Sequence, residues 1–231
     1  MSHKKIAVIG VGKYGYEIAL NLSSKGAEVH AFDVSSSKIE DIKEEVALAV
    51  VMDSTDKRAL LAQKIEEMDA AIVAIGENFE ATVLTSLNLK DLKIPRIIAR
   101  ASGENQMRIL KSLGIEETLE PEEEIASIVA ERLINPSITA FLQLPDNYEI
   151  AEVKAPRRIL NRTLADIQLL EKYSLTLITL KRLFEEDENG ESVKKEHILG
   201  VLQEETVLHE TDTLVVFGTL DNVKKFIEIN E

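Results

Sequence analysis

The chain has 231 residues with a formal net charge of −14, 45% hydrophobic and 4% aromatic residues, and no cysteine. Its length fits one large or two modest globular domains, and we expect two. The acidic charge argues against nucleic acid as a partner, because affinity for polyanions comes from clustered Lys and Arg. The lack of cysteine excludes disulfides, thiolate metal sites and cysteine nucleophiles.

The N-terminal residues bear on the location of the chain. Only four apolar residues, 6–9, separate Lys5 from Gly10. That run is far shorter than a signal peptide core or the roughly 20 apolar residues that cross a bilayer. We therefore expect a cytoplasmic protein.

The first part of the chain alternates short apolar runs with longer amphipathic stretches. The runs are rich in Val, Ile and Ala, which is typical of buried parallel strands. They lie at residues 6–9, 28–32, 47–51, 70–75 and 96–99. The segments between them carry helix signals, such as the serine cluster before residues 38–43. This alternation predicts an α/β fold with a Rossmann-like, doubly wound parallel sheet.

A helix is predicted after the sheet, and the pattern of apolar runs changes beyond it. Pro121 and three glutamates form a typical helix start, apolar residues continue at helical spacing to Leu133, and Pro136 ends the pattern. This helix packs on its own sheet or carries contacts with a second subunit, and the spacing does not separate the two. Shorter strands at 149–153, 175–180 and 213–217 then predict a small α+β domain. They are separated by a polar stretch at 185–195, whose first part, 185–190, is most simply a solvated hairpin tip. We place the domains at 1–136 and 137–231.

The most informative motif follows the first predicted strand and opens a helix. It is the run Gly10-Val11-Gly12-Lys13-Tyr14-Gly15. The first glycine permits a tight turn, the second lets backbone amides approach a pyrophosphate, and the third allows close helix packing. The helix N-terminus favours an anion at the same place. The motif predicts a nucleotide site, and the alternative is a glycine turn without a ligand.

Polar residues follow the other predicted strands, at the edge where open α/β sheets bind ligands. Asp33, 18 residues after Gly15 and followed by Val34, is placed to accept hydrogen bonds from ribose hydroxyls. The remaining candidates follow the third, fourth and fifth strands: Asp53, Ser54 and Thr55; Ile75, Gly76 and Glu77; and Arg100. Each of these groups is alternatively a capped turn, and Arg100 either neutralises phosphate or faces solvent.

The sequence lacks a convincing catalytic group. An oxidoreductase needs a proton donor or acceptor beside its cofactor, but the four histidines are scattered and His30 lies within a strand. We therefore expect a protein that is not an enzyme. An NAD-dependent oxidoreductase with a small substrate domain and a nucleotide-responsive regulator of another partner remain as alternatives.

Several of these segments together resemble the RCK family, of the KtrA and TrkA type, which regulates potassium conductance. The resemblance covers nearly the whole chain, with a TrkA-N half and a looser TrkA-C half. It is carried by residues 7–15, Asp33, 53–56, 73–76 and 119–122.

The resemblance implies a cytosolic regulatory subunit that binds ATP, ADP or NAD(H) as a signal. It also implies dimers that assemble into a ring of eight beneath a membrane-embedded, KtrB- or TrkH-like potassium-translocating subunit, at the inner face of the membrane. Asp33 would hold the ribose and residues 12–15 the phosphates, with Lys13 standing where relatives often carry Arg. Arg100 stands where relatives often have a basic residue.

The resemblance also implies a divalent cation, Mg²⁺ or Ca²⁺, between subunits at Glu122. The alternative is a glutamate that only suits the helix dipole. Some relatives bind cyclic di-AMP through a Leu-Arg stretch and a later Asn-Ile pair. Here those places hold Leu169-Leu170 and Thr176-Leu177, so we do not expect that ligand.

Overall fold

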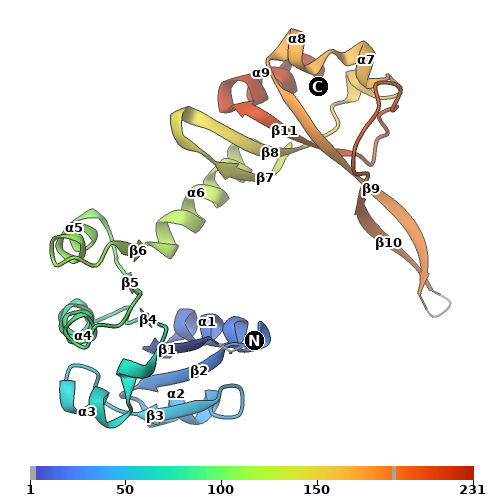
Figure 1. The fold of residues 1–231 in the computed structure, drawn as a ribbon. Helices are drawn as coiled ribbons and strands as arrows, with labels where there is room; N and C mark the ends of the chain where they lie inside the picture. The colour runs from blue at the N-terminus through green and yellow to red at the C-terminus, as the bar shows by residue number, and fades with distance from the viewer. Residues whose placement is uncertain (1–3, 189–190) are drawn as a thin grey trace. The chain divides into compact units, whose positions relative to one another are not determined.

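The computed structural model describes residues 4–188 and 191–231. The chain forms two compact units, Met1–Glu124 and Ile125–Glu231, which Figure 1 shows in blue to green and in green to red. The units meet in sequence within helix α6 (Pro121–Ile134). The domain boundary after residue 136 stays a prediction.

The first unit contains a parallel sheet of six strands in the order β3-β2-β1-β4-β5-β6. Their bounds are β1 Lys5–Ile9, β2 Glu28–Asp33, β3 Leu48–Val51, β4 Ala70–Val73, β5 Ile97–Arg100 and β6 Glu117–Leu119. The order reverses between β1 and β4, so the predicted doubly wound sheet is confirmed. All five predicted strands are present. The short β6, with only three residues, was not predicted.

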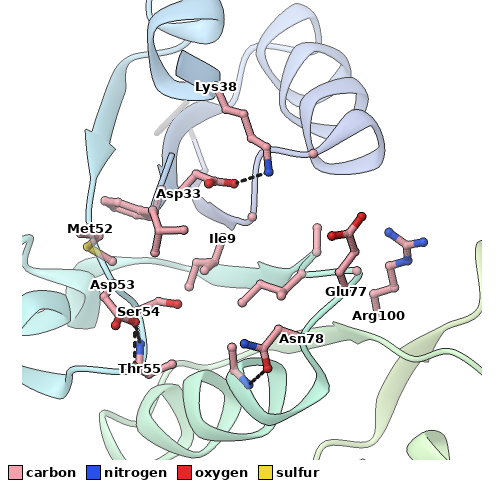
Figure 2. Close-up of a pocket in the computed structure, with 18 of the residues that line it drawn as sticks. Ile9, Asp33, Lys38, Met52, Asp53, Ser54, Thr55, Glu77, Asn78 and Arg100 are labelled. Atoms are coloured by element: carbon pink, nitrogen blue, oxygen red, sulfur yellow. Dashed lines mark hydrogen bonds and ion pairs between the residues drawn. The ribbon is translucent and has the colours of Figure 1, made fainter. Parts of the chain in front are cut away.

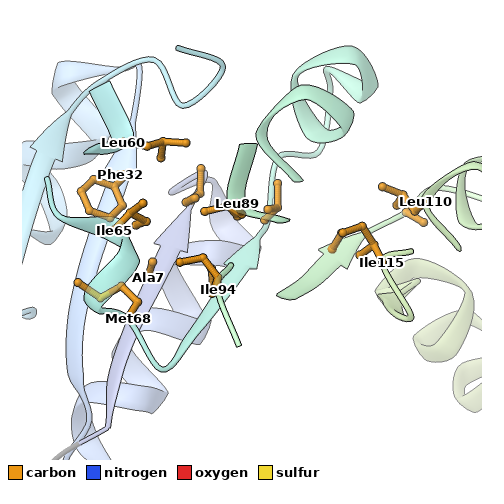
Figure 3. Packing of buried hydrophobic residues seen from close by; sticks show 14 residues of the cluster. Ala7, Phe32, Leu60, Ile65, Met68, Leu89, Ile94, Leu110 and Ile115 are labelled. Carbon is orange, nitrogen blue, oxygen red and sulfur yellow. The ribbon is translucent and has the colours of Figure 1, made fainter. Parts of the chain in front are cut away.

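Helices connect the strands of this sheet. They are α1 Lys13–Ser24, α2 Ser36–Ile42, α3 Lys57–Ala62, α4 Phe79–Asp91 and α5 Glu104–Ser112, with a 3-10 turn at Ile65–Glu67. Side chains alternate between the two faces of a strand, and in β1 Ala7 and Ile9 join one buried cluster while Val8 joins another. Figure 3 shows the first cluster, around Phe32 and Leu89. Burial on both faces explains the continuous apolar runs in the sequence.

The second unit contains an antiparallel sheet of five strands in the order β10-β9-β11-β8-β7. Its elements are β7 Ile138–Gln143, β8 Tyr148–Lys154, β9 Thr176–Glu188, β10 Glu191–Ile198 and β11 Thr213–Thr219, with helices α7 Leu164–Ile167, α8 Leu169–Tyr173 and α9 Leu220–Asn230. Phe226 of α9 is fully buried against the sheet core, which includes Leu180 and Val216. The predicted small α+β unit is confirmed.

One part of the second unit corrects the sequence prediction. The polar stretch 185–195, expected to begin with a hairpin tip at 185–190, continues as strand: β9 extends to Glu188, β10 begins at Glu191, and the two pair from Lys181↔Ile198 to Glu188↔Glu191. Opposite charges across the pair explain why so polar a segment forms a hairpin, and Lys195 lies 3.6 Å from Glu186. Residues 189–190 lie outside the described residues. Over the part of the chain that is described, no helix is long and apolar enough to cross a membrane.

Candidate functional site

A cavity of about 760 Å³ opens at the carboxyl ends of strands in the parallel sheet, and Figure 2 shows many of the side chains that surround it. Its volume is typical of small-molecule sites, and its place, at the strand-order reversal, is where doubly wound sheets bind ligands. Twelve predicted site residues line it: Gly10, Gly12, Lys13, Asp33, Val34, Asp53, Ser54, Thr55, Ile75, Gly76, Glu77 and Arg100.

Two of the three loop glycines are required by the fold itself. Gly10 has a φ of +91°, and a Cβ there would lie 2.9 Å from the backbone nitrogen of Ile75. A Cβ on Gly15 would lie 1.9 Å from the carbonyl oxygen of Gly10, so any side chain would push α1 away from the loop. Gly15 is not among the cavity-lining residues, and its place is explained by helix packing.

Gly12 has no such structural requirement. Its φ of −73° suits any residue, and a Cβ there would meet no described atom within 4 Å. Gly12 is the N-cap of α1, and within the described part of the chain no side chain caps this helix end. The first N–H groups of a helix lack intrahelical partners, and at this helix end Gly12 and Lys13 line the cavity. This is the arrangement that binds anions at helix N-termini.

Asp33 joins the glycine loop to the end of β2. Its Oδ2 accepts the N–H of Val11 at 2.7 Å and its Oδ1 accepts the N–H of Ser35 at 2.8 Å. Lys38 Nζ lies 3.5 Å from Oδ2, and the Asp33 side chain is only 6% exposed. Each carboxylate oxygen has two lone-pair sites, so the carboxylate supports the loop and keeps acceptor capacity toward the cavity.

The turns after β3 and β4 are capped and also line the cavity. Asp53 Oδ1 accepts the N–H of Thr55 at 2.9 Å and its hydroxyl at 2.7 Å. Asn78 Oδ1 accepts the N–H of Ala81 at 3.0 Å and caps α4. Ser54 is buried, with its hydroxyl 2.7 Å from that of Thr85. These residues were candidates either for a ligand site or for capped turns. The two interpretations are compatible, because the residues that cap the turns also form the cavity wall.

Arg100 lies where three segments meet. Its guanidinium forms an ion pair with Glu122, in the first turn of α6. Its Cζ lies 5.6 Å from the ring centroid of Tyr14, a cation–π distance. Burial and, after it, the charge of Glu124 raise the pKa of the Tyr14 phenol, while Arg100 opposes the shift. Tyr14 does not line the cavity, so it contacts the site through Arg100.

The sequence did not single out several residues of the cavity wall. Lys38, in the first turn of α2, is the most informative because it pairs with Asp33. A basic residue five positions after the strand-ending aspartate was the available signal. The others are Phe32, Met52, Glu80, Ala81 and Leu84. Asn78, which directly follows Glu77 at the end of the fourth predicted strand, and Ile9 and Ala74, which lie in segments that carry the resemblance, also line the cavity. Within residues 4–188 and 191–231, no group of three or more His, Asp or Glu side chains is arranged to hold a metal, and a cation at Glu122 stays a prediction.

The fold and the cavity define a Rossmann-like α/β protein with a glycine-rich turn at its ligand edge and a second, antiparallel unit. The sequence profile of the TrkA-N domain matches residues 6–121. The chain belongs to this family, which confirms the resemblance.

Two curated relatives extend the likeness over nearly the whole chain. Ktr system potassium uptake protein C of Bacillus subtilis (strain 168) is 31% identical over 223 residues, 96% of each chain. Ktr system potassium uptake protein A of the same organism is 29% identical over 226 residues, 98% of this chain and 96% of that one. The chain is thus a homologue of Ktr potassium uptake subunits.

Solved structures show the same fold at lower identity. The GsuK RCK domain matches 97% of this chain and 46% of its own with a TM-score of 0.55 and 22% identity. The GsuK channel bound to NAD matches 99% of this chain and 39% of its own with a TM-score of 0.61 and 18% identity. GsuK bound to ADP matches 56% and 34% with a TM-score of 0.50 and 24% identity. The chain spans less than half of these proteins, and the likeness establishes an RCK-like fold.

Proposed function

We propose that this chain is a regulatory subunit of a potassium uptake system and that its first unit binds an adenine nucleotide, ATP, ADP or NAD(H). Full-length homology to Ktr uptake proteins supports the role in potassium uptake. The ligand is supported above all by Gly12, a glycine that the fold does not require and that borders the cavity at a helix N-terminus. GsuK structures with NAD and with ADP are consistent with this ligand class.

The residues present fit the parts of such a ligand. The open N-terminus of α1 with Lys13 suits phosphates, and Arg100 adds a guanidinium on the cavity wall. Asp33 retains acceptor sites for ribose hydroxyls. Met52 and Ile75 supply apolar wall for a base. The bound nucleotide would supply negative charge as a signal.

The proposed role is regulatory and not catalytic. Among the described residues, no histidine lines the cavity, and the side chains of Asp33, Asp53 and Asn78 are engaged in holding turns. A ligand shifts a protein between two conformations only by binding one of them more tightly. We propose that nucleotide state does this in dimers assembled as a ring of eight, which dock at the cytoplasmic face of a membrane-embedded potassium-translocating subunit. A Mg²⁺ or Ca²⁺ ion at Glu122 would require a second copy of the chain.

Gly12→Ala tests nucleotide binding at the glycine loop with little change in the stability of the fold. Among residues 4–188 and 191–231 the added methyl group meets nothing within 4 Å, but it occupies the space where phosphate would approach the loop amides. Losing one charge-assisted hydrogen bond costs about 1.5 to 3 kcal/mol, so calorimetry should show roughly ten- to hundredfold weaker binding of ADP or NAD. The thermal midpoint without ligand should stay close to that of the wild type.

Gly103→Ala is the matched control. Gly103 is also a helix N-cap, of α5, and no described atom lies within 4 Å of an added Cβ there. Its φ, however, is +84°, and it lies outside the cavity wall. This variant should lose stability, because alanine is strained at positive φ, and keep its nucleotide affinity. Equal affinity of Gly12→Ala and the wild type would overturn the proposed site.

A further inference from the structure

The guanidinium of Arg100 is part of the cavity wall and is also occupied by a carboxylate of the same chain. Arg100 lines the cavity, and its partner Glu122 lies in the first turn of α6. The Arg100 side chain is 21% exposed and the Glu122 side chain 63% exposed. The Arg100 side chain is therefore mostly covered by protein, whereas its anionic partner is mostly in solvent.

Contacts other than the ion pair fix the guanidinium in place. One face lies against the Tyr14 ring, at 5.6 Å from its centroid. On another side, Nη1 lies where a Cβ on Gly76 would be only 2.7 Å away, so the guanidinium packs on a backbone segment that itself lines the cavity. These contacts do not depend on Glu122. The guanidinium would keep its position if the carboxylate moved away.

Carboxylate and phosphate compete for the same group. A guanidinium presents a planar fork of donors that matches the oxygens of either anion. Glu122 has a favourable alternative, because a negative charge in the first turn of a helix is stabilised by the helix dipole without a partner. Its high exposure means that release returns the carboxylate to water at little cost.

We propose that Glu122 is a built-in competitor for Arg100, which a phosphate group of the nucleotide displaces on binding. This inference rests on the proposed function and adds a regulatory contact to it. Occupancy of the cavity would then be reported at the start of α6, the helix in which the chain passes from the first unit to the second. The exchange replaces one anion on Arg100 by another, and the cation stays on Tyr14.

Glu122→Gln in the full-length chain tests the competition. Glutamine keeps the size of the side chain and removes the charge that holds Arg100. Exposed ion pairs are worth little, so calorimetry with ADP, in EDTA to exclude divalent cations, should show binding about two to five times tighter than in the wild type. Glu123→Gln is the matched control, since it removes the same charge from the same helix turn and should leave the affinity within about twofold.

The same substitution in an Arg100→Gln background separates competition from a general charge effect. Arg100→Gln should weaken ADP binding, and adding Glu122→Gln to it should change nothing further, because the contested cation is gone. Circular dichroism checks that each variant is folded. Two results would overturn this inference alone, provided that the wild type binds ADP. One is an equal affinity of Glu122→Gln and Glu123→Gln for ADP, and the other is the same tightening by Glu122→Gln in the Arg100→Gln background. No nucleotide binding by the wild type or by Glu122→Gln overturns the proposed function, and the inference with it.

Discussion

Asp33→Asn is the substitution that most sharply separates the support of the glycine loop from the binding of a ligand. Asp33 accepts the N–H groups of Val11 and Ser35 at 2.7 and 2.8 Å, and its side chain is 6% exposed. Asparagine keeps the shape but replaces one oxygen with a donor, so one of the two amides loses its acceptor. A buried donor left unsatisfied costs about 1 to 3 kcal/mol, which lowers the thermal midpoint by roughly 2 to 12 °C in a chain of this size.

The assay is thermal unfolding by circular dichroism, followed by calorimetry with ADP. Asp33→Asn should be less stable, because one amide loses its acceptor. It should also bind ADP more weakly, because Asp33 shapes the glycine loop and because the variant has one acceptor fewer for the ribose. Asp53→Asn is the control, since Asp53 is exposed and, among the described residues, its side chain bonds only to Thr55. Its midpoint should change by no more than the equivalent of about 0.5 kcal/mol. An Asp33→Asn midpoint equal to the wild type would refute the role of Asp33 in holding the loop.

Two further predictions concern the second unit. Asp212→Asn should lower the free energy of unfolding by about 3 kcal/mol in urea, because the buried carboxylate pairs with Arg182 at 2.6 Å and its loss leaves the Arg182 charge uncompensated. Glu152→Gln removes a carboxylate from a more exposed pair and should cost less than about 1 kcal/mol. Equal losses in the two variants would contradict the larger contribution of the buried pair. Burial, and after it the charge of Glu131, raises the pKa of Glu149, whose Oε1 has no hydrogen-bond partner among the described residues. The folded state therefore binds this proton more tightly than the unfolded state, and stability falls as pH rises from the ordinary carboxyl pKa through the raised one. At pH 8, Glu149→Gln should unfold at a higher urea midpoint than the wild type, and at pH 5 this increase in the midpoint should be smaller. A difference in midpoint that does not change with pH would contradict the raised pKa of Glu149.

The first unit was largely predictable from the sequence, for physical reasons. Strands buried on both faces appear as continuous apolar runs, so residues 6–9 and 70–75 indicated β1 and β4 directly. The glycine loop was recognisable because Gly10 and Gly15 are fixed by backbone geometry that no other residue satisfies. These constraints are local in sequence, and a pattern of residues records them.

Features that depend on distant pairing were not predictable. β10 was not predicted because its polar side chains are matched by charges on β9. Over the paired residues, neither strand shows an apolar run in the sequence. The ion pair of Arg100 with Glu122 joins residues 22 positions apart, and spacing alone does not reveal it. Lys38 resembled any exposed helix lysine until the fold placed it beside Asp33.

The most direct test of the central claim is a calorimetric titration of the full-length chain with ADP, ATP, NAD and NADH. The proposed function predicts saturable binding of at least one of these nucleotides at one site per chain. It also predicts a thermal midpoint that rises with ligand concentration, because a ligand specific to the folded state stabilises it. Absence of both heat and thermal shift for all four nucleotides at millimolar concentration would contradict it.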